Sequence, residues 1–199
     1  FALFVSCDTI LVLGEVLYRI SSLHPCMKIG IIGGSGLDNP DVLRDAQEQQ
    51  YKTHYGAVPS SKTGTIGGLD VVLITRHGKA HTIPPSQVNY RANIRLLQVL
   101  DCTHIFATTA VGSLQEDLRP GDVVVLDQFI DFTRNRQNTF YDSFDPHKPV
   151  HMPMAEPFDK DLRDRLIRGC KDVQLGYHPR GTVLTIEGPR FSTRDRKST

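Results

Sequence analysis

Short apolar runs recur along the chain and predict strands that are buried on both faces. Val71–Thr75 reads VVLIT and Val123–Leu126 reads VVVL, with no polar alternation. Such runs are typical of strands with no water-facing side. The predicted strands are Lys28–Ile32, Gly64–Ile66, Val71–Thr75, His104–Thr108, Val123–Leu126 and Thr182–Ile186. Gly67-Gly68 predicts a hairpin turn between the second and third of them.

Helical periodicity is clear in a first segment that we expect to begin at a Ser86 N-cap and to end at Leu100. Apolar residues three and four apart predict one buried face, because these spacings fall on one side of a helix. The residues of that face are Val88, Ala92, Leu96 and Val99.

A second helix is predicted over about Phe158–Val173, where Leu162, Leu166 and Cys170 recur at intervals of four. Asp159 and Asp161 lie in its first turn and Lys171 in its last. This charge order stabilises a helix because it opposes the helix dipole.

The predicted fold class is α/β, with a mixed central sheet flanked by helices. Residues 133–151 are polar and aromatic without periodicity. A loop of that length inside a compact domain is usually functional or interfacial.

Composition narrows the class of protein. The 199 residues hold 23 basic and 22 acidic side chains, which is no electrostatic footprint of a nucleic-acid binder. Hydrophobic content of 39% fits a soluble globular protein with one sizeable core. The cysteines have no short paired spacing, so neither a zinc site nor a disulfide framework is indicated. We therefore expect a cytoplasmic setting and no membrane contact.

The first 26 residues are apolar but carry Asp8, Glu15 and Arg19, without a basic leader. Their apolar stretch is broken too early for a membrane span. Met27 opens directly into the first clear strand. We expect residues 1–26 to be an upstream extension, with a genuine helical extension as the alternative, and residues 27–199 to form a single domain.

A glycine loop follows the first clear strand, in the run KIGIIGGSGL. Backbone N–H groups and the Ser35 hydroxyl of such a loop can bind an anion. The glycine order does not match a dinucleotide fingerprint, and Pro40 interrupts the segment where the crossover helix would run. A bare phosphate is the simpler ligand. The alternative is a tight turn that only needs glycine torsions.

Arg76-His77 comes directly after Val71–Thr75. Arginine offers a planar, permanently charged fork for phosphate, and an imidazole can add a donor. A surface salt bridge with an exposed histidine is the alternative. His77 and His81 are four residues apart, but the HExxH glutamate is absent and glycine and prolines disfavour a helix, so we do not expect a metal site.

Two further loops follow strand-like runs. Thr109 and Ala110 lie where hydroxyls and amides reach phosphate or ribose oxygens, although β-branched residues can simply end a strand. The loop from Glu187 to Ser192 combines a carboxylate, an arginine, an aromatic ring and a hydroxyl, which suits sugar hydroxyls and a flat base. A structural turn with Phe191 in the core is its alternative.

Taken together, these motifs resemble the trimeric purine nucleoside phosphorylase family, and within it the methylthioadenosine phosphorylase branch. The matching stretches run in family order over about residues 28–194. They read KIGIIGGSGLDNP, TRHGKAHTIPPSQVNYRANI, CTHIFATTAVGSLQEDLRPGDVVVLDQFIDFT, HMPMAEPF and GTVLTIEGPRFSTR.

The resemblance implies a glycosyltransferase that uses inorganic phosphate, without a cofactor, to cleave methylthioadenosine or a related purine nucleoside such as methylthioinosine, inosine or guanosine. It implies a homotrimer or a dimer of trimers active in purine and methionine salvage. The residues that it assigns to phosphate are Ser35, Arg76, His77, Thr109 and the Ala110 amide. Phe191 is expected against base or sugar, Ser192 at the base-specificity position, and His151 in a neighbouring subunit's pocket.

The resemblance also implies that the aspartate assisting the leaving purine lies beyond the end of this chain. We therefore expect residues 27–199 to form a nucleoside phosphorylase domain that is incomplete at its carboxyl end and inactive as written. Two alternatives remain: a nucleosidase that uses water, and an inactive fragment or non-catalytic, anion-binding oligomerisation remnant.

Overall fold

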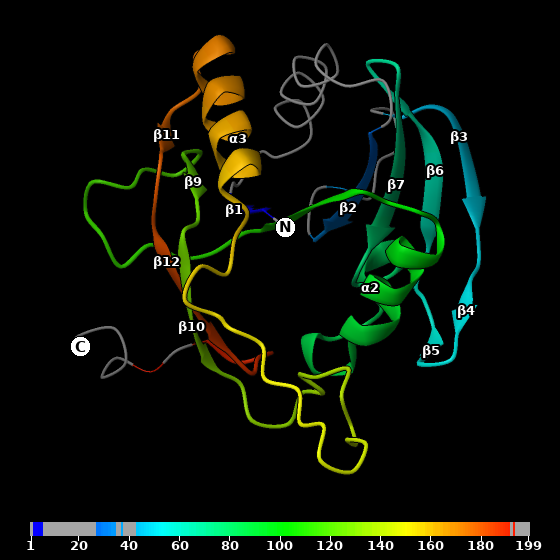
Figure 1. Cartoon of the computed structure of the whole chain (residues 1–199). Coiled ribbons are helices and arrows are strands. Elements are labelled where there is room, and N and C mark those ends of the chain that lie inside the picture. Colours follow the sequence, from blue (N-terminus) through cyan, green and yellow to red (C-terminus); the bar gives the residue numbers. More distant parts are fainter. Residues whose placement is uncertain (1, 6–26, 35–36, 38–42, 192, 194–199) are drawn as a thin grey trace.

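A mixed sheet forms the centre of the fold. The computed structural model describes residues 2–5, 27–34, 37, 43–191 and 193. Within them, eight strands join in the order β11-β9-β1-β8-β2-β7-β6-β3 (Figure 1). Their bounds are β1 Ala2–Val5, β2 Lys28–Gly33, β3 Arg44–Gln49, β6 Ser61–Ile66, β7 Leu69–Thr75, β8 His104–Thr109, β9 Val123–Val125 and β11 Tyr177–His178. The predicted α/β class with a mixed sheet is confirmed.

Two smaller strand pairs accompany this sheet. β4 (Lys52–Thr53) pairs with β5 (Gly56–Ala57) antiparallel, and β10 (Gln128–Phe132) pairs with β12 (Thr182–Ile186) parallel. In Figure 1 the β10–β12 pair lies below β9, and the long yellow loop that follows β10 reaches across toward α2.

All six predicted strands are present, and the Gly67-Gly68 hairpin joins β6 to β7 antiparallel. The sequence missed β3, whose six residues RDAQEQ are all exposed. β3 lies at one edge of the eight-stranded sheet, and because its residues are all exposed, no buried face imposes an apolar alternation on it.

β1 lies inside the sheet, parallel to β8 on one side and antiparallel to β9 on the other. β1 belongs to the segment 1–26 that we expect to be an extension. Its four residues are the part of that segment that the structure describes. The boundary at Met27 stays a prediction, and a chain that begins there tests it directly by its folding yield.

Two helices, α2 (Tyr90–Val99) and α3 (Lys160–Asp172), pack on opposite faces of the sheet. In β2, Ile31 belongs to the buried cluster lined by α3, whereas Ile32 belongs to the cluster lined by α2. Successive residues of a strand point to opposite faces, so each helix covers its own face. Among the described helices, none combines the length and apolarity needed to cross a membrane.

The start of α2 corrects the expected Ser86 cap. Pro85–Gln87 forms a separate 3₁₀ turn, and Val88 has an extended backbone with ψ 123°. The helix begins after Asn89, whose side chain accepts a hydrogen bond from the Ala92 amide at 3.0 Å. Asparagine is as strong an N-cap as serine, and here the proline-led turn delays the helix by three residues.

The buried face of α2 also differs from the prediction at its last turn. Val99 is 58% exposed, whereas Leu97 is fully buried. Leu97 packs over Gly30 of β2, where a Cβ would collide with the leucine methyl groups. The close approach of helix to strand therefore depends on glycine at this position.

The second helix agrees with the prediction. Leu162, Leu166 and Cys170 are buried on one face. Asp159 is the N-cap, and its carboxylate accepts the Leu162 amide at 2.8 Å. Burial raises the pKa of the Cys170 thiol to about 11, which is typical of an inert core cysteine.

Candidate anion and nucleoside site

The site is built where three neighbouring parallel strands end. β2 pairs with β7 on one side and with β8 on the other, and Gly33 of β2 is level with Thr75 of β7. Because parallel strands share one carboxyl edge, the loops that follow them open on the same side of the sheet. Ligands of open α/β sheets bind at this edge. Three of the four predicted loops thus meet there.

Arg76 crosses this edge. Its backbone N–H donates to Gly33 O at 3.0 Å. Its side chain donates to Thr108 O at 2.6 Å and to Thr109 Oγ1 at 3.4 Å. The guanidinium passes so close to Gly34 that a Cβ there would collide with it. The glycine loop, the arginine and the threonines are therefore in direct contact.

The electrostatics of Arg76 favour an anionic partner. Burial lowers the pKa of its guanidinium; Tyr90 opposes this shift, and the nearby Arg136 cation adds to it. Arginine nevertheless remains charged at physiological pH. A largely buried positive charge is costly unless a negative charge or good acceptors compensate it. The environment of Arg76 is thus suited to binding an anion.

His77 is fixed by its own turn. Its Nδ1 lies 2.9 Å from Ile83 O, and its ring stacks on His81 at 5.3 Å between centroids. Gly78 allows the turn with φ 71°, in the region that disfavours other residues. In the part of the chain that the structure describes, no group of three His, Cys, Asp or Glu side chains is arranged to hold a metal ion.

Apart from Thr109, which Arg76 contacts, the other residues of the predicted site are less closely gathered. Thr109 is half-buried and Ala110 is exposed at the end of β8. Phe191 is 91% exposed, and His151 is exposed in the long loop. Ser35 and Ser192 lie outside the described residues. The assignments of all these residues stay predictions.

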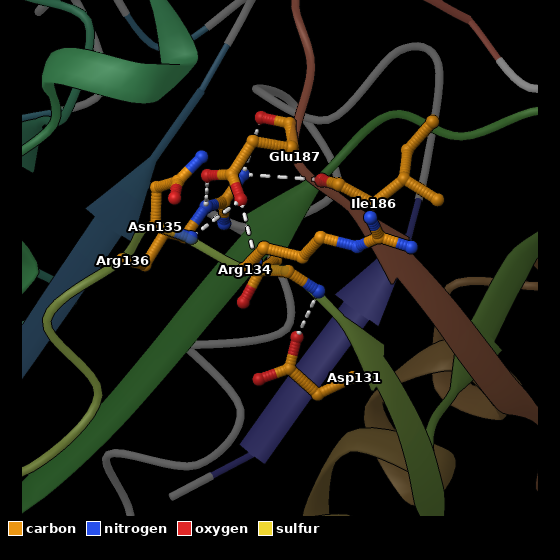
Figure 2. A network of polar contacts seen from close by, with 7 residues as sticks. Asp131, Arg134, Asn135, Arg136, Ile186 and Glu187 are labelled. Atoms are coloured by element: carbon orange, nitrogen blue, oxygen red, sulfur yellow. Dashed lines mark hydrogen bonds and ion pairs between the residues drawn. The ribbon is translucent and has the colours of Figure 1, made fainter.

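Glu187 has protein partners rather than the sugar hydroxyls that the sequence suggested. Its carboxylate accepts the amides of Arg134 and Asn135 at 2.6 and 3.0 Å and the Arg136 Nε–H at 3.3 Å (Figure 2). These bonds lower the pKa of Glu187, the Arg134 amide contributing most. The next residue, Gly188, lies close to Pro85, since a Cβ added to Gly188 would be 3.3 Å from the proline side chain.

Sequence reasoning missed Tyr90 and Arg136. The Arg136 guanidinium lies over the Tyr90 ring at 5.0 Å, and burial raises the pKa of the tyrosine. Tyr90 opens α2, and three strands, β8, β9 and β10, separate it in the sequence from the polar loop that carries Arg136. Residues 133–151 have no periodicity that would indicate which side chain turns inward, so no sequence signal distinguishes Arg136 from its neighbours.

The fold and the edge site define a class of proteins. The sequence pattern of the phosphorylase superfamily matches residues 28–198. The chain therefore belongs to the phosphorylase superfamily.

Among its relatives are enzymes named S-methyl-5′-thioadenosine phosphorylase. That of Danio rerio is 51% identical over 172 residues, covering 84% of this chain and 61% of the relative. That of Thermofilum pendens is also 51% identical over 172 residues, with 84% of this chain and 63% of the relative covered. The chain thus spans about three-fifths of the length of these curated relatives.

Solved structures show the same fold. Methylthioadenosine phosphorylase from Schistosoma mansoni without ligand superposes with a TM-score of 0.80 at 44% identity, covering 86% of this chain and 68% of that one. The same enzyme in complex with adenine gives 0.79 at 44% identity, with 86% and 69% covered.

Proposed function

We propose that this chain forms the phosphate-binding part of a methylthioadenosine phosphorylase. The reaction is the phosphorolysis of 5′-methylthioadenosine, or of a related purine nucleoside, to the free base and (5-methylthio)ribose 1-phosphate. The relatives' names support the substrate class. The observation that carries the proposal is the position of Arg76, which joins the glycine loop and the end of β8 at one edge of the sheet.

The chemistry follows from this position. A phosphate oxygen forms a bond to C1′ of the ribose while the bond from C1′ to the purine nitrogen breaks, and the base leaves with that electron pair. The sugar becomes positively charged in the transition state, so a phosphate dianion beneath it stabilises that charge as well as attacking. Phosphate is a co-substrate, and the proposal needs no cofactor.

The chain's residues have distinct parts in this reaction. Arg76 binds phosphate through its planar fork of donors. His77, Thr109, the Ala110 amide and Ser35 complete the phosphate site. The two bonds from Arg76 to the end of β8 set the plane of the guanidinium before phosphate arrives. Preorganised donors avoid reorganisation during the reaction.

The remaining assignments place the nucleoside. Phe191 lies against the base or sugar, Ser192 is at the base-specificity position, and His151 reaches the 5′-substituent pocket of a neighbouring subunit in a homotrimer. The exposure of both Phe191 and His151 supports a role at a surface that another subunit or the substrate covers. We place the enzyme in the cytoplasm, where cysteines such as Cys102 and Cys170 remain as free thiols.

Phosphate binding tests the proposal on the 199-residue chain. We expect isothermal titration with inorganic phosphate to show saturable binding that chloride at equal ionic strength does not reproduce. Absence of phosphate binding contradicts the proposal.

Turnover is tested in a chimera that continues after Thr193 with the carboxyl-terminal sequence of the Danio rerio relative. We expect adenine to be released from methylthioadenosine only when phosphate is present. Equal release without phosphate identifies a nucleosidase instead.

A further inference from the structure

Glu187 ties the end of β12 to the segment that follows β10. One carboxylate oxygen accepts two consecutive backbone amides, those of Arg134 and Asn135, and the other accepts the Arg136 side chain (Figure 2). Arg136 Nη2 also donates to the carbonyls of Ile186 and Glu187 at 3.2 and 3.0 Å. Five hydrogen bonds therefore join two loops that are about fifty residues apart in the sequence.

The ion pair within this connection is sheltered from water. The side chains of Arg136 and Glu187 are only 17% and 26% exposed. A surface ion pair contributes little because water and salt screen it, whereas partly buried groups are screened much less. Breaking one partner of such a pair leaves the other charge poorly compensated.

The same arginine fastens the loop to the first residue of α2. Its guanidinium lies over the Tyr90 ring at 5.0 Å. The next residue, Arg91, pairs with Asp142 at 2.6 Å and stacks on Tyr55 at 4.9 Å. Two consecutive residues of α2, Tyr90 and Arg91, thus contact the loop at Arg136 and at Asp142. Glu187 orients Arg136.

Tyr90 links this connection to Arg76. The ring is largely buried and lies under the Arg136 guanidinium, and the charges of both Arg136 and Arg76 oppose the rise that burial causes in its pKa. Arg136 likewise adds to the lowering of the Arg76 pKa that burial begins. Two guanidinium groups close to one phenol repel each other. The Glu187 carboxylate offsets the charge of Arg136, so that both can stay in place.

We propose that Glu187 is a positioning residue for the anion site. It holds Arg136 against Tyr90, and these two side chains line the anion site beside Arg76. The inference rests on the proposed phosphate function. Removing a negative charge near an anion site strengthens anion binding by Coulomb's law, whereas removing a positioning group weakens it.

The test compares Glu187→Gln and Glu187→Ala with Asp131→Asn in the 199-residue chain. Asp131 is a matched control because its carboxylate accepts the Thr133 amide at 2.8 Å in the same segment, next to the connection in Figure 2. Hydrogen exchange at the Arg134 and Asn135 amides reports the connection, and titration with inorganic phosphate reports the site.

We expect both Glu187 variants to speed exchange at the two amides and to weaken phosphate binding, by about three- to tenfold for glutamine. The control keeps the phosphate affinity and the protection of both amides. Unchanged exchange in Glu187→Ala overturns the connection. Unchanged or tighter phosphate binding in Glu187→Gln overturns the positioning role. The proposed function still holds in that case, provided that the wild-type chain binds phosphate. A wild-type chain that binds no phosphate overturns both.

A second variant keeps the inference falsifiable if the Glu187 variants fold poorly. Arg136→Lys retains the positive charge but loses the planar group that stacks on Tyr90 and bonds two carbonyls. We expect it to weaken phosphate binding as Glu187→Gln does. Wild-type phosphate affinity in Arg136→Lys contradicts the proposal, because net charge alone then suffices.

Discussion

Arg76 Nη1 donates to Thr108 O at 2.6 Å, and this bond joins two strands that are not neighbours. Arg76 follows β7 and Thr108 belongs to β8, with β2 lying between them. Adjacent strands are about 4.8 Å apart, so the side chain spans two such intervals. It does so over Gly34, directly after β2, where no side chain stands in its way.

Position 34 therefore needs a glycine because the Arg76 side chain passes there, and not because the turn itself requires one. We expect Gly34→Ala to displace the guanidinium, because the added Cβ would collide with it. Phosphate binding should weaken to nearly the same extent as in Arg76→Ala. Calorimetric titration of both single variants and the double variant measures this.

The double variant separates an effect through Arg76 from independent damage to the loop. If Gly34→Ala acts by moving Arg76, it causes no further loss once the arginine is absent, since residues in contact are not additive. Additive losses in the double variant would show that the glycine has a separate role in the loop.

The corrected face of α2 leads to a stability prediction. Leu97 is fully buried against Gly30, so Leu97→Ala leaves a cavity and should lower the free energy of unfolding by about 2–5 kcal/mol. Val99 is 58% exposed, and Val99→Ala should change the free energy of unfolding by no more than about 0.5 kcal/mol. Urea unfolding of the two variants distinguishes them, and equal losses would restore the face predicted from sequence.

The Asp122 carboxylate predicts a pH dependence of stability. It accepts the Arg119 amide at 2.9 Å and lies 3.3 Å from His178 Nε2, and these contacts, the amide first, lower its pKa. A lowered pKa means that its stabilisation is present above the unfolded value of about 3.9 and is lost as the pH falls through the folded value. We expect Asp122→Asn to have a lower Tm than wild type at pH 7.

The difference in Tm should shrink as the pH falls below about 3.9, because the wild-type carboxylate then also becomes neutral. Asp117→Asn, at an exposed position between β8 and β9, serves as the control and should follow the wild-type curve. A difference in Tm between wild type and Asp122→Asn that stays constant down to pH 3 would contradict the assignment.

The sequence predicted the buried strands because burial on both faces leaves its own pattern. Val71–Ile74 of β7 are all apolar and buried, and the shortness of such a run favours a strand over a helix. The start of α2 could not be predicted in the same way. Ser86 and Asn89 are both good caps, but Ser86 lies within the Pro85–Gln87 turn, and the helix begins only after Asn89.

The same distinction applies to the candidate site: the residues at strand ends could be predicted, and the contacts made by the long loop could not. The positions of Arg76 and Thr109 could be predicted because Arg76 follows one strand and Thr109 ends another, and parallel strands bring their carboxyl ends to one edge whatever the loops do. The partners of Glu187 depend on how residues 134–136 cross from β10 to α2. A loop without periodicity carries no pattern from which that path can be read.

The sharpest prediction concerns Arg76 itself. If Arg76 binds phosphate through its planar fork, Arg76→Ala removes a charged hydrogen-bond pair worth about 1.5–3 kcal/mol. We expect a ten- to hundredfold rise in the Kd for phosphate in the 199-residue chain. In the chimera, the KM for phosphate should rise far more than the KM for nucleoside. Arg76→Lys should recover only part of the loss, because lysine keeps the charge without the fork.

Arg163→Ala is the matched control for this experiment. Arg163 also donates to backbone carbonyls near strand ends, to Leu126 O at 2.8 Å and Pro179 O at 3.0 Å, but on the side of the sheet near β9 and β11. Its loss should lower stability and leave the Kd for phosphate unchanged. If Arg76→Ala behaves in the same way, Arg76 is a structural tie between β7 and β8. The phosphate assignments of Ser35, His77, Thr109 and Ala110 then lose their anchor, because they depend on the guanidinium at this edge.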